Sequence, residues 1–253
     1  MSEIKVIFQD SDILVLDKPA GLVVTPADTI TSETLSDILT AEFKINLDRG
    51  GVVHRLDKDT SGVIIAAKTQ EVLENLQAQF KSRQVKKQYL ALVHGEFKES
   101  RVVLGAIARN PGNREKFIVW DEDGKPAETG FEPIQRFEMK QEGIVEIFPG
   151  FSKIQYKKLS AIRYPLFTLL NCFPLTGRTH QIRVHLKYIG HPVVSDEKYA
   201  GRKMYRLDRR WCPRQFLHAQ RLELNHPRTG KKMVFESGLA GDLSSALSVL
   251  EKI

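Results

Sequence analysis

The sequence predicts a mixed α/β fold built as a single domain over residues 1–253. Three observations lead to this prediction. The chain has 253 residues, of which 42% are hydrophobic and 27% charged, a balance typical of globular proteins with a sizeable core. The spacing of apolar residues changes repeatedly along the chain, which favours interwoven strands and helices over a helical bundle. No internal repeat or low-complexity tract is present.

The first half of the chain alternates strand-like runs with amphipathic stretches. Gln9 to Asp12 is a polar turn between two such runs, which predicts an N-terminal hairpin. A short helix is predicted over 34–43, and Gly50-Gly51 breaks the chain after it. A longer amphipathic helix follows, with one apolar face made of Val72, Leu73, Leu76 and Phe80. The predicted strands are 4–8, 13–16, 63–67 and 89–93.

The second half begins with a stretch that is rich in turn-forming residues. Residues 105–125 contain many Gly, Asn, Pro and Asp, and we expect a long irregular excursion there. A helix is predicted over 179–189. Another is predicted over 239–253, with Leu243, Leu247 and Leu250 facing inward. The predicted strands are 131–137, 166–173, 216–224 and 232–235.

Positive charge is concentrated in one part of the chain. The 38 Lys and Arg exceed the 31 Asp and Glu by seven, and the stretch from Ile147 to Ser195 has seven basic residues and no acidic one. Residues 196–214 add a further excess of four, with aromatic residues interleaved. Cations bind phosphates and flat rings stack on bases, so this pattern favours a nucleic-acid-binding face. A solvated basic surface is the alternative interpretation.

Two other classes of protein are excluded by composition. No apolar run approaches the ~18 residues that span a bilayer, and the first residues lack the plan of a signal peptide. We therefore expect no membrane partner. The only cysteines, Cys172 and Cys212, cannot build a disulfide framework or a four-thiolate zinc site within the chain. A reducing cytoplasm is the expected compartment.

The densest cluster of reactive side chains is a polar turn at residues 54–62, which reads HRLDKDTSG. Seven of its nine side chains are polar, and it lies between two strand-like runs. Catalytic residues concentrate in loops that rigid strands hold in place. The turn therefore supplies the first candidate site residues, although a plain surface turn would have the same composition.

A second cluster covers residues 176–185. Gly177 precedes the predicted helix, whose first amides suit phosphate oxygens. His180, His185 and His191 do not predict a metal site. On a helix His180 and His185 would lie about 140° apart, and His191 would lie about 16 Å farther along the axis than His180. We therefore expect no bound metal.

Asp57 and Arg183 are the most informative pair across the two clusters. A bidentate guanidinium would fix the plane of the Asp57 carboxylate and keep it ionised near neutral pH. Such a pair would make an activated carboxylate. An ordinary structural salt bridge is the alternative.

Two other enzyme classes fit the turn less well. Asp57 and Asp59 resemble the Asp-x-Asp start of haloacid-dehalogenase phosphohydrolases, which use an aspartyl nucleophile and magnesium. Ser61, however, stands where that family has Thr or Val. A glycosidase would need two carboxyl groups at separations that acids two residues apart do not provide.

The motifs together resemble the RluA-type family of RNA pseudouridine synthases. The turn at 54–62 resembles the family's catalytic motif without a mismatch, and residues 17–21 resemble its opening motif. The later motifs follow in order at 87–95, 177–185 and 217–227, so the resemblance covers about residues 4–236.

This resemblance implies isomerisation of uridine in RNA to pseudouridine, without cofactor or metal. It implies that Asp57 is the essential carboxylate, attacking either the uracil ring or the ribose, and that Arg183 forms an ion pair with it. Tyr89 would stack on the target uracil and assist removal of the C5 proton. Arg55 would occupy the space left by the flipped base, whose extrusion costs a few kcal/mol.

The resemblance also implies a mostly antiparallel central sheet flanked by helices, with an active-site cleft across it. The S4-like RNA-binding domain of many relatives is expected to be absent, and residues 143–163 look like a basic insertion that supplements RNA contacts. The predicted RNA-binding residues are His54, Arg55, Lys153, Lys157, Lys158, Arg178 and His180. We expect a monomer that modifies ribosomal or transfer RNA. The alternative is a noncatalytic RNA-binding or ribosome-assembly protein with the same fold.

Overall fold

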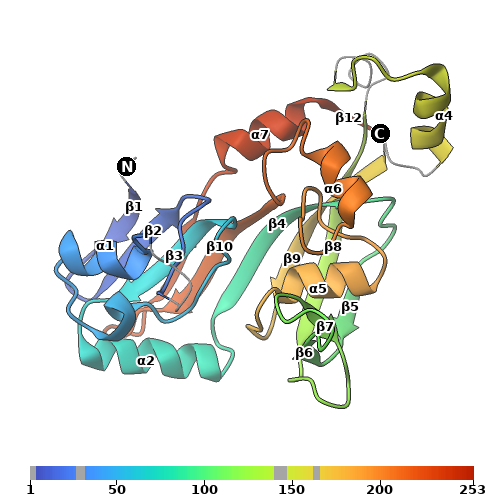
Figure 1. Ribbon diagram of the computed structural model, residues 1–253. Helices are drawn as coiled ribbons and strands as arrows, with labels where there is room; N and C mark the ends of the chain where they lie inside the picture. Colours follow the sequence, from blue (N-terminus) through green and yellow to red (C-terminus); the bar gives the residue numbers. More distant parts are fainter. Residues whose placement is uncertain (1–3, 27–31, 140–146, 162–165) are drawn as a thin grey trace. The chain divides into compact units, whose positions relative to one another are not determined.

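The computed structural model describes residues 4–26, 32–139, 147–161 and 166–253, which form two compact units (Figure 1). Unit 1 comprises residues up to Gln88 together with His218–Gly238, and unit 2 comprises Tyr89–Leu217 and Leu239–Ile253. The chain therefore passes between the units within two strands, β4 (Lys86–His94) and β10 (Leu217–Asn225), and again after Gly238.

Unit 1 is a mostly antiparallel sheet with the order β1-β2-β3-β10-β11. Its other strands are β1 (Lys5–Gln9), β2 (Ile13–Lys18), β3 (Ser61–Ala67) and β11 (Lys232–Glu236). Strands β3 and β10 pair in parallel, through Ser61 opposite His218 and Gly62 opposite Ala219. All seven residues of β3 are buried, so this strand runs through the interior of the unit.

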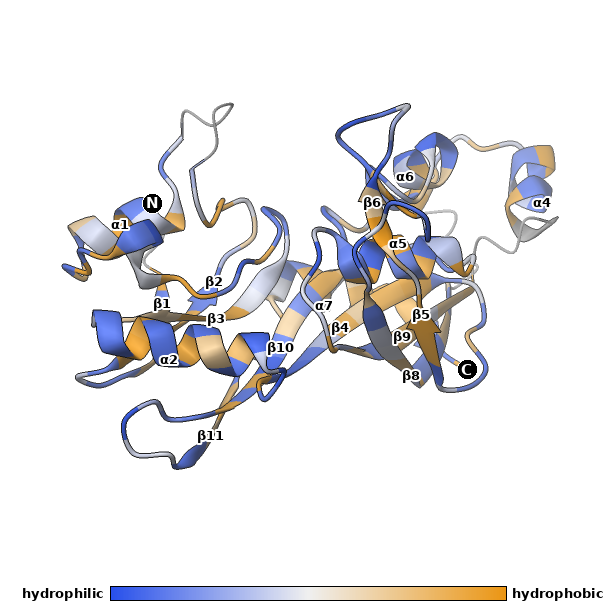
Figure 2. Ribbon diagram, turned by 90° about the horizontal axis from the view of Figure 1, so that it is seen from below, coloured by the Kyte–Doolittle hydropathy of each residue, from blue (hydrophilic) through white to orange (hydrophobic). Residues whose placement is uncertain are grey.

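Helices α1 (Leu35–Ala41) and α2 (Gln70–Lys81) complete unit 1, together with the 3-10 turn η1 (Asp48–Gly51). Thr34 and Asp37 form a capping box at the start of α1. Along α2 hydrophobic and hydrophilic residues alternate at helical spacing (Figure 2). Its apolar residues Val72, Leu73 and Leu76 join the core of β2 and β3, as the amphipathic pattern predicts.

Unit 2 is built on a second antiparallel set, in which β4 pairs β9 (Leu166–Pro174) and β9 pairs β8 (Glu128–Met139). Strand β8 also pairs β5 (Arg101–Leu104) and β12 (Leu250–Lys252). A separate two-stranded ribbon joins β6 (Ile107–Arg109) to β7 (Phe117–Val119). The helices among the described residues of this unit include α4 (Lys153–Ala161), α5 (Gln181–Tyr188), α6 (Arg202–Asp208) and α7 (Gly241–Ser248).

The predicted class, a mixed α/β fold with mostly antiparallel pairing, is confirmed. Several elements differ from the prediction. The expected loop at 105–125 contains β6 and β7, and the helix expected over 239–253 ends at Ser248, after which Leu250 is buried against β8 in strand β12. Tertiary pairing overrides local propensity there. No helix within the described ranges is long and apolar enough to span a bilayer.

Candidate active site

The turn that carries Asp57 lies between η1 and β3 in unit 1. Leu56 is buried and anchors the turn, whereas Arg55, Lys58 and Asp59 are exposed. The backbone amide of Thr60 donates to the carbonyl of Asp57 at 3.0 Å, which tightens the chain just before β3. Asp57 itself is only partly buried. The turn thus presents this carboxylate at the start of a rigid, buried strand.

Lys18 ties the Asp57 turn to the end of β2. Its side chain is fully buried, and its Nζ donates to the carbonyl oxygens of Pro19 (2.8 Å), Leu22 (2.8 Å) and Lys58 (2.9 Å). The amide of Gly21 donates to the same Lys58 carbonyl at 2.9 Å. An ammonium group has three N–H donors, so three carbonyls satisfy it. Two chain segments about 40 residues apart are therefore held together next to Asp57.

Lys18→Met is expected to destabilise the protein by about 3 kcal/mol, because the buried carbonyl oxygens lose a charged donor. Turnover should fall as well, since the turn at Asp57 loses its anchor. Lys58→Met is the matched control, because the side chain of Lys58 is exposed and only its carbonyl is used. Urea unfolding measures both variants. Equal midpoints would mean that the Lys18 contacts do not stabilise the turn.

The chain leaves the turn through Ser61 and Gly62, which lie against β10. Ser61 donates its hydroxyl hydrogen to Nδ1 of His218 at 2.9 Å, and Nε2 of His218 donates to the carbonyl of Ser237 at 3.2 Å. Gly62 has φ +113°, and a Cβ there would lie 2.1 Å from the carbonyl oxygen of Ala219. Only glycine lets the two backbones approach this closely.

His54, predicted to contact RNA, is also part of the packing of unit 1. Its ring stacks on Phe80 with centroids 4.9 Å apart, and its Nε2 accepts the amide hydrogen of Ile65 at 3.2 Å. Burial, assisted by the charge of Lys87, lowers the pKa of His54 from 6.5 to about 3. Burial also lowers the pKa of Lys87 to about 8. Any contact of His54 with RNA is therefore made by an uncharged ring.

The lowered pKa of His54 predicts a pH-dependent stability. The unfolded imidazole takes up a proton near pH 6.5, whereas the folded one does so only near pH 3. The stability that comes from the neutral ring is complete above pH 6.5 and is lost as the pH falls toward 3. The slope is at most about 1.4 kcal/mol per pH unit. The free energy of unfolding is measured in urea between pH 7 and 4. In His54→Gln the part of its pH dependence that comes from His54 should disappear. A pH dependence equal to that of the wild type would contradict this prediction.

Arg183 lies on α5 in unit 2 and is 5% exposed. Its Nε and Nη2 donate to Oδ2 and Oδ1 of Asp196 at 2.7 and 2.8 Å, a bidentate pair. Asp196 is fully buried and also accepts the amide hydrogens of Lys198 and Tyr199. Two of the five N–H donors of the guanidinium are thus directed by Asp196, which fixes the plane of the fork. The sequence predicted Arg183 as a site residue but did not identify Asp196 as a partner.

Tyr199 connects Arg183 to His180. The guanidinium lies over the Tyr199 ring at 5.1 Å, and the Tyr199 hydroxyl bonds to Nδ1 of His180 at 2.8 Å. The same hydroxyl accepts the amide hydrogen of Phe117 at 3.0 Å. His180 has φ +56°, so the helix predicted from 179 begins at Gln181. Arg183 and His180, both predicted from one motif, are therefore brought into one network.

Gln181 organises the turn before α5. Its Oε1 accepts from the amide of Arg178 (2.9 Å) and the hydroxyl of Thr176 (2.7 Å), while its Nε2 donates to β8. Arg178 is exposed, and its Nε donates to the carbonyl of Pro126 at 3.2 Å.

Tyr89 lies on β4 opposite Cys172 of β9 and is partly buried against the core of unit 2.

His180, His185 and His191 each bond to a different protein group. His180 contacts Tyr199 as described above. His185 is buried, which lowers its pKa, and it bonds through Nδ1 to Thr129 and through Nε2 to the carbonyl of Gly105. His191 donates from Nδ1 to the carbonyl of His94. The three histidines thus contact three different parts of unit 2.

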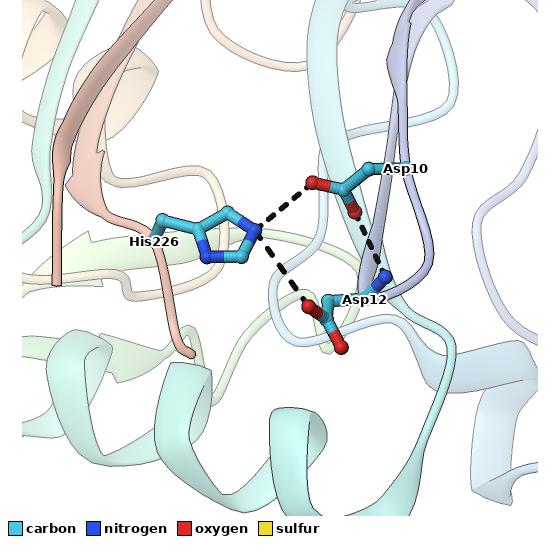
Figure 3. Close-up of side chains that lie close together, drawn as sticks. All are labelled: Asp10, Asp12 and His226. Carbon is cyan, nitrogen blue, oxygen red and sulfur yellow. Dashed lines mark hydrogen bonds and ion pairs between the residues drawn. The ribbon is translucent and has the colours of Figure 1, made fainter. Parts of the chain in front are cut away.

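Asp10, Asp12 and His226 have the composition of a metal site and point toward one another (Figure 3). The nitrogen and oxygen atoms that could bind a metal already form hydrogen bonds or ion pairs within the protein. His226 accepts the amide hydrogens of Arg228 and Thr229 at Nδ1, so its proton is on Nε2 and is donated to Asp10 at 2.9 Å. Asp12 forms a bidentate ion pair with Arg228. The cluster therefore holds the turn between β1 and β2 against His226 and Arg228.

The predicted basic insertion at 143–163 lies partly outside the described residues. Within it, α4 presents Lys153, Lys157 and Lys158 as exposed side chains.

The predicted site residues fall into two groups. His54, Arg55 and Asp57 share one turn of unit 1, whereas Tyr89, Arg178, His180 and Arg183 and the three lysines belong to unit 2. The structure adds Lys18, His218, Asp196 and Tyr199 as residues that hold these groups in place.

Known proteins are similar to this chain over most of its length. A family model described as RNA pseudouridylate synthase matches residues 12–188. The "Ribosomal large subunit pseudouridine synthase D" of Nitrosomonas europaea is 36% identical over 260 residues, covering 99% of this chain and 66% of the relative. The protein of that name from Pseudomonas aeruginosa is 37% identical, and the match covers 99% of this chain and 72% of the relative.

A solved structure is similar over nearly the whole chain. It is titled "Human RNA Pseudouridylate Synthase Domain Containing 1" and is 25% identical, with a TM-score of 0.72. The match covers 99% of this chain and 89% of that chain. The sequence motifs, the family model and the fold thus agree on one family.

Proposed function

This chain belongs to the RNA pseudouridylate synthase family, and from that membership we propose that Asp57 is its essential carboxylate. The reaction of the family is the isomerisation of uridine in RNA to pseudouridine. The N-glycosidic bond from N1 to the ribose breaks, the uracil turns, and C5 bonds to the ribose in its place. The C5 proton leaves and N1 gains a proton, so the reaction is balanced without a co-reactant.

The observation that most directly supports Asp57 is the construction of its turn. The side chain is partly exposed, while the backbone around it is held by Leu56, by Lys18 and by the pairing of Ser61 with His218. Catalytic groups need such rigid support with a reachable side chain. Asp57 attacks either C1′ of the ribose or the uracil ring, and both routes use the same carboxylate.

We propose that Arg183 forms an ion pair with Asp57, and that both units act as one catalytic domain. Asp196 supports this role because it directs two donors of the guanidinium and so presets its plane. A fixed cation beside a carboxylate keeps that carboxylate ionised near neutral pH. Asp196 and Tyr199 would then be positioning residues that act through Arg183.

Tyr89 is proposed to stack on the target uracil and to assist removal of the C5 proton. Its partly buried ring in the first half of β4 offers a flat apolar face with a polar tip. Arg55, exposed two residues before Asp57, is proposed to fill the space that the flipped nucleotide leaves. Flipping costs a few kcal/mol, so a side chain that compensates for the broken stacking favours the reactive state.

The proposed substrate is structured RNA, with ribosomal RNA as the first candidate. The curated relatives described above carry ribosomal large subunit in their names, and this chain is similar to them over nearly its whole length. Transfer RNA is the second candidate. We propose that the protein is a monomer and that it is cytoplasmic; two free, buried cysteines support the second part. The proposed RNA contacts are His54, Arg55, Arg178, His180 and the lysines of α4.

The proposal is tested by adding purified protein to RNA from a strain that lacks the gene, and then mapping pseudouridine. We expect one or a few restored sites in large-subunit ribosomal RNA, with equal yield in excess chelator. Restored sites in transfer RNA would move the substrate to the second candidate. If the wild-type protein binds RNA but restores no site in either class, the noncatalytic RNA-binding alternative replaces the enzyme.

A further inference from the structure

Helix α6, labelled in Figure 1, and the turn after it carry a dense group of exposed cations in unit 2. An open depression of about 420 Å³ is lined there by Leu207 and by four basic side chains. The basic residues are Arg202, Lys203, Arg206 and Arg210, and all four are exposed.

The carboxylate of the same helix points the other way. Asp208 is fully buried, and its Oδ2 accepts from the amide of Ser195 at 2.8 Å and bonds to Nε2 of His94 at 2.9 Å. The negative charge of Asp208 therefore interacts with buried groups inside unit 2. The helix thus separates its charges, with the acid inside and the bases outside.

The cations of the depression differ from two other arginines of unit 2. Arg183 and Arg214 each form a bidentate pair with an aspartate. Among the described residues no carboxylate lies in salt-bridge range of Arg202, Lys203 or Arg206. Like charges at i and i+4, as in Arg202 and Arg206, repel each other on a helix. A ligand with negative charge would relieve this repulsion.

Arg210 links the depression to helix α4. Its guanidinium lies 5.2 Å from the ring of Phe148 and 5.1 Å from that of Phe151. Tyr156 of α4 packs on Phe151 and donates its hydroxyl hydrogen to the carbonyl of Phe148 at 3.0 Å. The aromatic group thus joins α6 to the helix that presents the three exposed lysines. Arg210 and Tyr156 therefore contact the same pair of phenylalanine rings.

We propose that the depression on α6 binds the phosphodiester backbone of the substrate RNA, away from the nucleotide that reacts. This rests on the proposed function, because it assigns a second contact to the same RNA. Arginine forks match phosphate oxygens in geometry, and the exposed cations need only exchange water and counterions for phosphates. An acidic protein surface would meet the same charges, and the experiment below separates it from RNA.

The test compares the salt dependence of binding to a protein-free transcript of large-subunit ribosomal RNA. The variant is the triple Arg202→Gln, Lys203→Gln, Arg206→Gln. The control is the triple Lys5→Gln, Lys81→Gln, Lys231→Gln, which removes the same charge from exposed positions of unit 1. We expect the slope of log K against log salt to become shallower by about 0.7 to 0.9 for each phosphate that is no longer neutralised, or roughly 2 in total. Affinity at 0.1 M salt should fall at least about tenfold. The control should keep the wild-type slope.

Equal slopes for the two triple variants would overturn the proposal. The proposal would also be overturned if the triple variant of α6 lost binding to ribosomal particles but kept its binding to the naked transcript. That result would assign the depression to an acidic protein. The double variant Arg202→Gln, Arg206→Gln should give about two thirds of the shift, and circular dichroism checks folding. A wild-type protein that forms no pseudouridine while the slopes still differ would refute the proposed function and leave the RNA surface standing.

Discussion

Asp57→Asn is expected to lower pseudouridine formation by roughly 10⁴-fold or more while the protein stays folded. An amide of the same shape cannot act as a carboxylate nucleophile, and removing a nucleophile commonly costs this much. The supports of the turn come from Lys18, Leu56, Ser61 and the backbone, so the substitution leaves them in place. Single-turnover assays on an RNA that contains the mapped site measure the effect.

Asp59→Asn is the matched control for this variant. Asp59 is exposed, lies two residues away in the same turn, and loses the same charge. We expect it to keep most of the wild-type turnover. If both variants are equally slow, the effect belongs to the charge of the turn as a whole. If Asp57→Asn retains turnover, another group does the chemistry.

Arg183→Lys is expected to lower both stability and turnover. Lysine supplies a point charge in place of the fork, so one oxygen of the fully buried Asp196 loses its hydrogen bond. Breaking a buried pair costs about 3 kcal/mol or more, and we expect a loss near the lower end because the charge is kept. Turnover of the folded fraction should fall about 10²-fold, since the plane of the proposed Asp57 pair is no longer fixed.

Arg214→Lys separates these two effects. Arg214 also forms a bidentate pair, with Asp242 at 2.6 and 3.0 Å, and is buried, although the side chain of Asp242 is 38% exposed. We expect a smaller shift of the urea midpoint in the same direction, because Asp242 is partly solvated, with wild-type turnover per folded molecule. Assays are run well below the melting temperature of both variants. Equal turnover losses would mean that Arg183 acts only through stability.

Sequence alone predicts that Arg183→Lys lowers turnover and leaves folding intact. The structure revises this expectation, because the guanidinium has a buried structural partner as well as a proposed catalytic one. Asp196 is visible in the sequence only as the first acidic residue after a long basic stretch. Nothing in the spacing between Arg183 and Asp196 indicates a fork, since the pair is formed between a helix and the loop that follows it.

Local patterns predicted the regular elements well where one face is apolar. The hairpin of β1 and β2, helix α2 and strand β9 all lie where the alternation of residues puts them. The pattern failed where pairing with a distant strand decided the structure. Strand β12 forms because β8 offers an open edge, and β6 and β7 pair within a stretch that has the composition of a loop.

By itself the sequence determined the family, the fold class and the turn that holds Asp57, because these depend on residue types in a fixed local order. Only the tertiary structure decided which groups support the site. A buried ammonium takes whichever carbonyl oxygens surround it, and a buried carboxylate needs a donor from any element in reach. The contact from Lys18 to the Lys58 carbonyl and that from Ser61 to His218 span large separations in the chain, so no short motif could reveal them.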